Sequence, residues 1–329
     1  MGIVPRSTFA GMQLVGVEEA QTDLRRAYGE KHNLDPSLLF SDLDEMLDTV
    51  KPEAVAAFGS IRDHLRVVEC CAPRGIHVMV EKPMAISVAD AERMAALAHQ
   101  HGIHLLTNYE TTWYASTHEA IARTSDVAVF GKIRKVVFHD GHPGPVEIGC
   151  SPEFLSWLTD PAQSGGGALP DFGCYGANLM TRIMGDAQPL RVTAVIHQFK
   201  PDIYPRVEDD ATILVSYADA ECVIQASWNW PVSRKDIEIY AERGYLVAMN
   251  GRDIRARMGD KAEEHNETLP PLPAPLNDPF AHFAAVVRGD ITLEPYDVAG
   301  MANNVTVVRI LEAARQSAQC GQVVTLATD

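Results

Sequence analysis

The sequence is short of the features that mark metal-binding, secreted or membrane proteins. Its six cysteines include no C-x-x-C pair, and no histidine stands near them at the spacing of a metal site. It has no apolar run of about 18 residues, the length of a membrane-spanning helix. Its first residues lack the continuous apolar segment of a signal peptide. We therefore expect reduced thiols, no metal and a cytoplasmic protein.

Basic residues are also scarce. The chain has 28 lysines and arginines against 44 aspartates and glutamates, a net charge of −16 at pH 7. Binding to nucleic acid or to an anionic membrane depends on clustered basic side chains, so both partners are disfavoured. A pocket can still differ in charge from the surface as a whole, and a small-molecule ligand is the partner we expect.

A glycine-rich turn is the third absence. Residues 12–108 alternate short apolar runs with amphipathic segments, a pattern that predicts βαβ units and a parallel sheet. A doubly wound nucleotide-binding domain begins with a strand, a G-x-G-x-x-G turn and a helix. Only eleven residues precede the first predicted strand, 12–17, and they contain no such turn. We expect that the chain starts downstream of its natural beginning; the alternative is a sheet that closes differently.

The second half of the chain is richer in strands. Cys222, Ile224, Ala226 and Trp228 are alternate residues and share one face of a predicted strand. Several such segments with few intervening helices predict a mostly antiparallel sheet with one packed face. We predict an α/β protein with two parts: an incomplete, Rossmann-like parallel sheet in residues 1–110 and an α+β domain with an open, mostly antiparallel sheet in residues 111–329.

Glu81-Lys82-Pro83 is the first candidate for a functional motif. It follows the predicted strand 76–80, and ligands of open α/β sheets bind at the carboxyl ends of strands. Pro83 keeps the backbone of Lys82 extended, so the ammonium group can point into the crevice. The alternative is an ion pair at the protein surface.

A second candidate lies within residues 164–185. Gly165, Gly166 and Gly167 permit close backbone approach or positive φ. Asp171 and Tyr175 are four residues apart and share a face if the segment is helical. A carboxylate beside a phenol can handle protons. The alternative is a capping aspartate with a tyrosine in the core.

Glu18, just past the first predicted strand, is the third candidate. An acid at this place can accept hydrogen bonds from the ribose hydroxyls of NAD and disfavour the 2′-phosphate of NADP. It can equally be an acid favoured by the dipole of the following helix. His64, on a predicted helix near the crevice, is likewise either a ligand contact or a structural histidine.

These motifs together resemble the Gfo/Idh/MocA family, which is named for glucose–fructose oxidoreductase and inositol dehydrogenase. Glu18, the EKP motif at 81–83, Asn108, GKI at 131–133 and GGGALPDFGCYG at 165–176 occur in the family's order. The resemblance implies an N-terminal Rossmann domain and a C-terminal domain whose open sheet forms homo-oligomer interfaces. It also implies hydride transfer between NAD or NADP and a sugar, polyol or related secondary alcohol.

The resemblance assigns roles to single residues. It implies catalytic roles for Lys82, Asp171 and Tyr175, with Tyr175 in place of the family's usual histidine, as in the glucose–fructose oxidoreductase branch. We expect the Lys82 ammonium to lower the pKa of the Tyr175 phenol. NAD is favoured over NADP because of Glu18. The expected cofactor contacts are Glu18, Ser60, His64, Glu81, Lys82 and Asn108.

Three alternatives stay open from the sequence. The first is a non-catalytic ligand-binding or regulatory homologue that has lost its dinucleotide site. The second is a nicotinamide-dependent glycosidase or lyase, which would hold its cofactor tightly without net reduction. The third is a scaffold. The dehydrogenase hypothesis requires that Lys82 and Tyr175 meet across one cleft.

Overall fold

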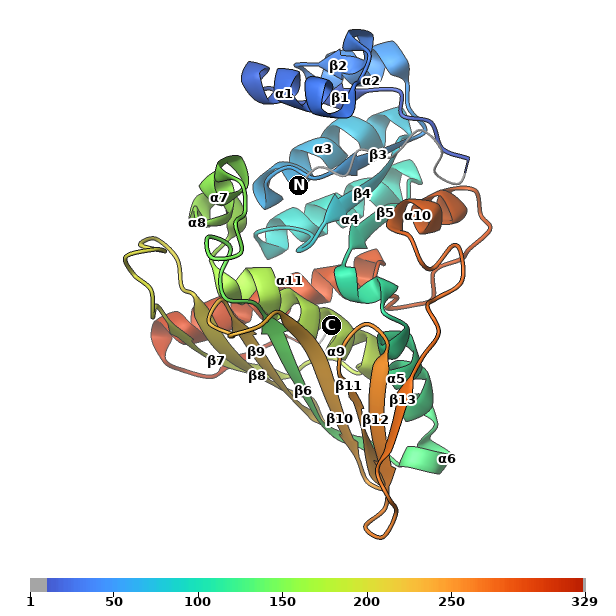
Figure 1. Ribbon diagram of the computed structural model, residues 1–329, viewed down its shortest axis with the longest axis vertical. Coiled ribbons are helices and arrows are strands. Elements are labelled where there is room, and N and C mark those ends of the chain that lie inside the picture. The colour runs from blue at the N-terminus through green and yellow to red at the C-terminus, as the bar shows by residue number, and fades with distance from the viewer. Residues whose placement is uncertain (1–10, 328–329) are drawn as a thin grey trace.

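The computed structural model describes residues 11–327. Its N-terminal part contains two separate parallel sheets (Figure 1). The first pairs β1 (Val17–Glu18) with β2 (Leu39–Phe40). The second has the order β3 (Ala54–Ala57), β4 (His77–Glu81), β5 (Leu105–Asn108). Within residues 11–327 no strand joins β1 to β3, which confirms the predicted incomplete parallel sheet. Of the strand predicted at 12–17, only its last residue is in β1, because β2 is a partner of just two residues.

Helices cover both faces of the β3–β5 sheet. On one face lie helices that connect the strands, and Val68, Val78 and Leu97 share an apolar cluster there. On the other face, Phe280 and Phe283 pack against Met79 and Leu106. Burial on both sides explains why these strands are continuous apolar runs in the sequence. The helices of this part are α1 (Thr22–His32), α2 (Leu43–Val50), α3 (His64–Cys71), α4 (Val88–His101) and, from the far end of the chain, α10 (Pro279–Val287).

The rest of the chain forms one nine-stranded sheet in the order β13-β12-β11-β10-β6-β9-β8-β7-β14. β6 and β9 pair in parallel, and all other neighbours are antiparallel. The mostly antiparallel sheet is therefore confirmed. Its strands are β6 (Ile133–Gly141), β7 (Arg191–His197), β8 (Asp210–Ser216), β9 (Glu221–Ser227), β10 (Arg234–Ala241), β11 (Gly244–Ala248), β12 (Asp253–Met258), β13 (His265–Thr268) and β14 (Val324–Thr325).

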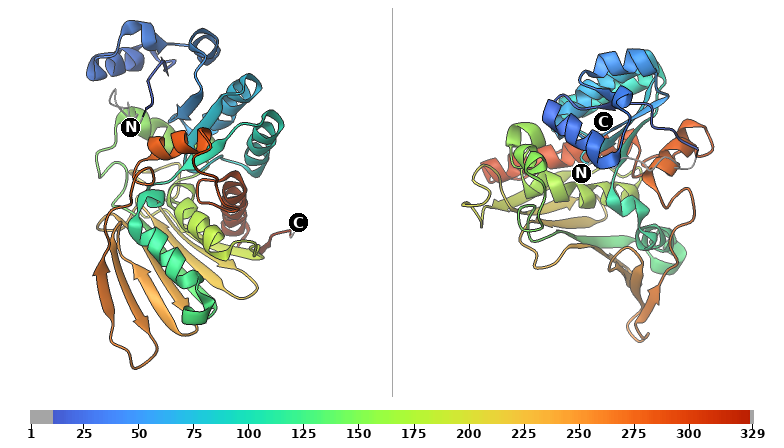
Figure 2. Two further views of the ribbon diagram at one scale, coloured as in Figure 1. Left: turned by 90° about the vertical axis from the view of Figure 1, so that its right-hand side faces the viewer. Right: turned by 45° about the horizontal axis from the view of Figure 1, so that its top comes forward.

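Among the described residues, helices lie on only one face of the nine-stranded sheet (Figure 2). Cys222, Ile224 and Ala226 point to this face and are fully buried, as the alternation predicts. The opposite face is open, and Val195 on it is 55% exposed. The helices of this part are α5 (Ala115–Ser125), α6 (Val127–Phe130), α7 (Pro152–Leu158), α8 (Pro161–Ser164), α9 (Ala168–Met184) and α11 (Met301–Cys320).

The two parts share their helices. α11 packs on α4 as well as on β7, and the Thr107 amide of β5 donates to the Ala299 carbonyl. The domain boundary at 110/111 stays a prediction. None of the helices within residues 11–327 is long and apolar enough to cross a bilayer.

Candidate active site

The triple glycine sets the position of α9. Gly165 has φ +80°, a conformation that favours glycine, and a Cβ on Gly167 would overlap the Glu208 carbonyl oxygen. The Glu208 carboxylate accepts hydrogen bonds from the amides of Gly167 (2.7 Å) and Leu169 (3.1 Å). These amides open the helix and have no intrahelical partner, so Glu208 caps α9 from a distant loop. The predicted close approach of the backbone is present.

Lys82 and Asp171 form a buried ion pair between β4 and α9. The Lys82 Nζ donates to the Asp171 carbonyl oxygen at 2.9 Å and forms an ion pair with its Oδ1. The Trp228 Nε1 donates to the other carboxylate oxygen, Oδ2, at 2.9 Å. Burial raises the pKa of the Asp171 carboxyl, but the Lys82 ammonium and the Trp228 indole outweigh it, and the pKa is below its ordinary value. Both Asp171 oxygens are thus occupied.

Tyr175 lies beside this pair. The Lys82 Nζ is 5.3 Å from the centroid of its ring, so the ammonium and the phenol do meet in one place. Tyr175 is only 5% exposed, and its hydroxyl makes no hydrogen bond within the described chain. Burial, followed by nearby Cys174 and Glu110, raises the pKa of the phenol well above its ordinary value. The expected lowering by Lys82 is wrong for the protein alone, because Asp171 neutralises that ammonium.

A second lysine reaches the same ring, and the sequence analysis missed it. The Lys235 Nζ is 5.3 Å from the Tyr175 centroid and forms an ion pair with Glu110 at 2.8 Å. Burial raises the pKa of the Glu110 carboxyl, but the Lys235 ammonium outweighs it and the net shift is downward. A signal was present, since Lys235 falls in phase with the buried Ile237 and Ile239 of β10.

Asp140 is a further polar residue beneath the site. It pairs with Lys235 in the register of β6 and β10, is 2% exposed, and its Oδ2 has no hydrogen-bond partner in the described chain. Burial raises the pKa of this carboxyl well above its ordinary value. The sequence analysis did not single out Asp140, although its alternation with Val136 and Phe138 on β6 was a signal visible in the sequence.

Four of the residues predicted to contact a cofactor lie at the carboxyl ends of β3, β4 and β5. The Asn108 Nδ2 donates to the Glu81 Oε1 at 2.5 Å, which ties the ends of β4 and β5 together beside Lys82. Ser60, just past β3, donates through Oγ to the Asp63 Oδ2 at 2.7 Å. The structure thus brings these groups to one edge of the sheet, and their cofactor role stays a prediction.

His64 is placed differently. It is 1% exposed, and its Nδ1 lies 3.1 Å from the Met84 carbonyl oxygen. Burial lowers the pKa of the imidazole to about 4, so the ring is neutral near neutral pH. This geometry favours the structural alternative, in which His64 fixes the turn that follows Lys82-Pro83. A direct contact with a cofactor stays a prediction.

Glu18 ends β1 in an acidic environment. Burial raises the pKa of its carboxyl, and Glu19, Asp42 and Asp63 add to the shift, while Arg66 opposes it. Four carboxylates around one cation make a poor site for a phosphate group. They suit a group that donates hydrogen bonds, such as a ribose hydroxyl.

The described residues fit parts of a nicotinamide dinucleotide. The Lys82, Asp171 and Tyr175 group lies at the strand ends, where the reacting ring of such a cofactor would bind. Glu18 fits the ribose at the other end. Residues 11–327 supply no glycine-rich turn between β1 and β3 to hold the pyrophosphate. The fit is therefore good at both ends of the cofactor and lacks the usual phosphate cradle within the described chain.

One group of side chains has the proximity of metal ligands. Atoms of His139, Asp236 and Glu238 lie within 4.8 Å of one another on the open face of the sheet. Arg234 already holds both Asp236 oxygens, at 2.7 and 2.6 Å. The group is thus partly neutralised by a protein cation, and the expectation of no metal stays a prediction.

Fold and site together define an oxidoreductase of the two-domain dehydrogenase type. Residues 6–109 match the model "Oxidoreductase family, NAD-binding Rossmann fold", and residues 118–247 match the model "GFO/IDH/MocA C-terminal domain". The chain belongs to the Gfo/Idh/MocA family, which confirms the resemblance.

Similar proteins include dehydrogenases of diols and sugars. Trans-1,2-dihydrobenzene-1,2-diol dehydrogenase of Bos taurus is 24% identical over 82% of this chain and 75% of its own length. D-apiose dehydrogenase of Paraburkholderia graminis is 22% identical over 96% and 84%. The crystal structure of aldose-aldose oxidoreductase from Caulobacter crescentus, complexed with glycerol, has a TM-score of 0.78 and 23% identity, covering 95% of this chain and 92% of that one.

Proposed function

We propose that this protein is a nicotinamide-dependent dehydrogenase that oxidises a secondary alcohol of a sugar or polyol, or reduces the corresponding carbonyl. The observation that carries the proposal is the Lys82 ammonium, paired with Asp171 and 5.3 Å from the Tyr175 ring. Lys82, at the carboxyl end of β4, thus lies beside Asp171 and Tyr175 of α9, about 90 residues later in the sequence. The diol and sugar dehydrogenases among its relatives support the substrate class.

Each residue has one role in the proposed reaction. The substrate loses a proton from its hydroxyl and a hydride from the same carbon, and becomes a carbonyl compound. Tyr175 exchanges the proton through its free phenol hydroxyl. Lys82 donates a hydrogen bond to the substrate oxygen and stabilises negative charge there. Asp171 orients Lys82, since both its oxygens are occupied. A bound nicotinamide would supply the hydride acceptor.

We propose NAD rather than NADP as the cofactor. Three further carboxylates, of Glu19, Asp42 and Asp63, act on the Glu18 carboxyl, and Arg66 opposes them. A 2′-phosphate placed there would meet net negative charge, whereas a ribose hydroxyl can donate a hydrogen bond to Glu18. Ser60, Glu81, Lys82 and Asn108 would contact the nicotinamide half from the ends of β3, β4 and β5.

The test is an assay of the whole chain. NAD or NADP is mixed with D-xylose, D-apiose, myo-inositol and glycerol, and formation of reduced nicotinamide is followed by absorbance. We expect the wild-type protein to reduce NAD with at least one aldose or polyol. The Tyr175→Phe variant should reduce NAD only at a small residual rate. Saturable binding of NAD without net reduction would support the non-catalytic or glycosidase alternative. Absence of binding to either cofactor would overturn the proposal.

We also propose that the open face of the nine-stranded sheet joins two copies of the chain. Val137, Val223, Leu214 and Thr193 lie side by side across four strands on this face, and Val195 is 55% exposed nearby. A mostly apolar row, with Thr193 at its end, on an uncovered sheet is typical of an interface. Val195→Glu is expected to shift light-scattering mass from dimer to monomer, whereas Val232→Glu, another exposed valine, leaves it unchanged. A monomeric wild-type protein would exclude the interface.

A further inference from the structure

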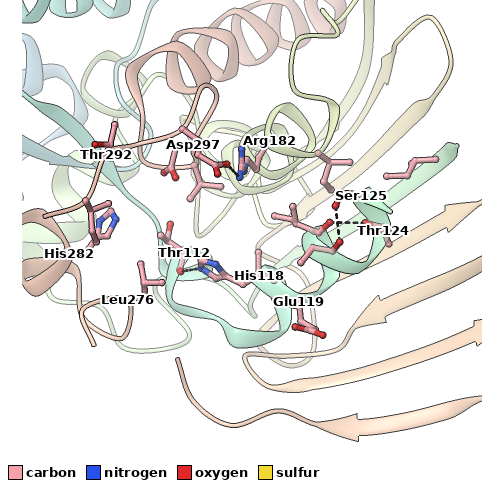
Figure 3. Close-up of a pocket in the computed structure, with 18 residues that line it drawn as sticks. Thr112, His118, Glu119, Thr124, Ser125, Arg182, Leu276, His282, Thr292 and Asp297 are labelled. Carbon is pink, nitrogen blue, oxygen red and sulfur yellow. Dashed lines mark hydrogen bonds and ion pairs between the residues drawn. The ribbon is translucent and has the colours of Figure 1, made fainter. Parts of the chain in front are cut away.

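A cavity of about 710 Å³ lies beside the C-terminal end of α9, and neither Lys82, Asp171 nor Tyr175 lines it. Its walls come from α5, the C-terminal half of α9 and the segment 276–298 (Figure 3). Arg182 in its wall is seven residues beyond Tyr175 on α9, which places it about 10 Å further along the helix axis. The cavity is therefore separate from the Lys82 site, and its volume is within the usual range for a small-molecule pocket.

His282 is the polar group that points to a ligand. It lines the cavity, is only 4% exposed, and its ring makes no hydrogen bond within the described chain. The ring nitrogens are not among the enclosed unpaired atoms of the described chain, so they are open to the cavity and can bond to a ligand there. Thr117, also in the wall and 2% exposed, has an Oγ1 without a partner among the described residues.

The charges of the wall disfavour an anionic ligand. Arg182 forms an ion pair with Glu294, so its charge is neutralised. Glu119 is paired with Arg123, at 2.6 Å. Asp297 keeps one carboxylate oxygen free, since only its Oδ1 accepts a hydrogen bond, from the Ala299 amide. Among the described residues the wall has no unpaired lysine or arginine for a phosphate or carboxylate group.

Apolar side chains form the rest of the wall. Ile121, Ile183 and Ile291 give surfaces for the C–H faces of a ring. The imidazole of His282, the free oxygen of Asp297 and the hydroxyl of Thr292 can accept hydrogen bonds, and a hydroxyl group of a ligand both donates and accepts. We propose that this cavity is a second binding site, which takes an uncharged polyhydroxylated molecule the size of a pentose or a cyclitol.

A chain of contacts connects the cavity with the catalytic lysine. The His282 ring packs edge-on against Trp113 with centroids 5.5 Å apart. The Trp113 Nε1 donates to the Asn108 Oδ1 at 3.1 Å, and Asn108 in turn donates to Glu81, the residue before Lys82. A ligand that binds His282 therefore changes the surroundings of the Trp113 indole, and its binding is visible in tryptophan emission.

The experiment compares two matched variants of the whole chain. Ala122 is exposed and lines the cavity, so Ala122→Trp places an indole in it without disturbing the core. Ala128 is also exposed but is outside the wall, and Ala128→Trp serves as the control. D-xylose, myo-inositol and inorganic phosphate are titrated into each protein by calorimetry, and emission is compared between wild type and Trp113→Phe. Circular dichroism and the melting temperature verify that both variants are folded.

We expect D-xylose or myo-inositol to occupy one site more in wild type and Ala128→Trp than in Ala122→Trp. The difference between variants separates this cavity from the Lys82 site, so the outcome does not depend on whether the sugar is also a substrate. The emission change should be present in wild type and lost in Trp113→Phe. Equal numbers of sugar sites in the two variants, or phosphate as the only bound probe, would overturn the proposal.

Discussion

The two halves of the proposed site are built differently. The side that carries the proton-transfer groups rests on a continuous nine-stranded sheet and on α9, whose start is capped by Glu208. The cofactor side rests on two small parallel sheets that no described strand connects. Lys82 belongs to the second but is held by Asp171 of the first. Catalytic geometry and cofactor affinity are thus supported by separate structures and can be lost separately.

Lys82→Met tests the link between the halves and should have the largest effect. It removes the cation that we propose to stabilise the substrate oxygen, and it leaves the buried Asp171 without its ion pair. We expect a loss of kcat/KM of at least about 10³-fold. We also expect a loss of stability of about 3–5 kcal/mol, since an unpaired buried charge is costly. The double variant Lys82→Met/Asp171→Asn should recover stability but not activity. Wild-type kinetics in Lys82→Met would remove this residue from the site.

Tyr175→Phe tests the substrate side alone. Loss of the proton-transfer group should reduce turnover about 10²–10⁴-fold with cofactor affinity unchanged. Because burial raises the pKa of this phenol, wild-type oxidation should rise with pH throughout the alkaline range, while carbonyl reduction should be fastest where the phenol is protonated. Kinetic pH profiles in both directions measure this. A profile that is the same in the variant would assign the proton transfer to another group.

His64→Gln tests the turn that follows Lys82-Pro83. The imidazole pKa is lowered to about 4 in the folded protein, against about 6.5 when unfolded. Below pH 6.5 the unfolded state binds the proton more tightly, so wild-type stability falls as the pH decreases toward 4. At pH 5 this contribution is about 2 kcal/mol. Urea unfolding from pH 7.5 to 5 should show a shallower decline for His64→Gln. If the free energy of unfolding declines equally with pH in wild type and in His64→Gln, His64 does not titrate as proposed.

Sequence reasoning was most successful where a motif and a strand end coincide. Lys82 and Asp171 were found because EKP ends an apolar run and the triple glycine precedes a helix. Lys235 was missed because its partner, Glu110, is 125 residues away, and only its phase with Ile237 marked it as inward-facing. The direction of the Tyr175 pKa shift also escaped, since it depends on burial and on neutralisation of Lys82 by Asp171, which a sequence does not display.

Lys235→Met examines this missed residue on the substrate side. Removal of this ammonium leaves the Glu110 carboxylate unpaired beside the Tyr175 ring, which should raise the pKa of the phenol further and lower oxidation about tenfold at a fixed pH. Lys235→Arg keeps the charge and should restore most of the rate. The pH profile of Lys235→Met should move to higher pH. An unchanged profile with a higher KM would instead indicate that Lys235 only binds substrate.

Glu18→Gln addresses the cofactor side, and its effect should be the smallest. The change removes one of four carboxylates near the end of β1 and leaves Arg66 in place. The ratio of kcat/KM for NADP to that for NAD should rise about tenfold, since one unfavourable charge contact of about 1.4 kcal/mol is lost at a partly exposed site. Glu45→Gln, on the exposed surface of α2, is the control and should leave the ratio unchanged. If Glu18→Gln changes neither cofactor's kinetics, the ribose does not bind at β1. The cofactor would then bind along a path that avoids β1. Lys82, Asp171 and Tyr175 would still be the residues proposed for catalysis.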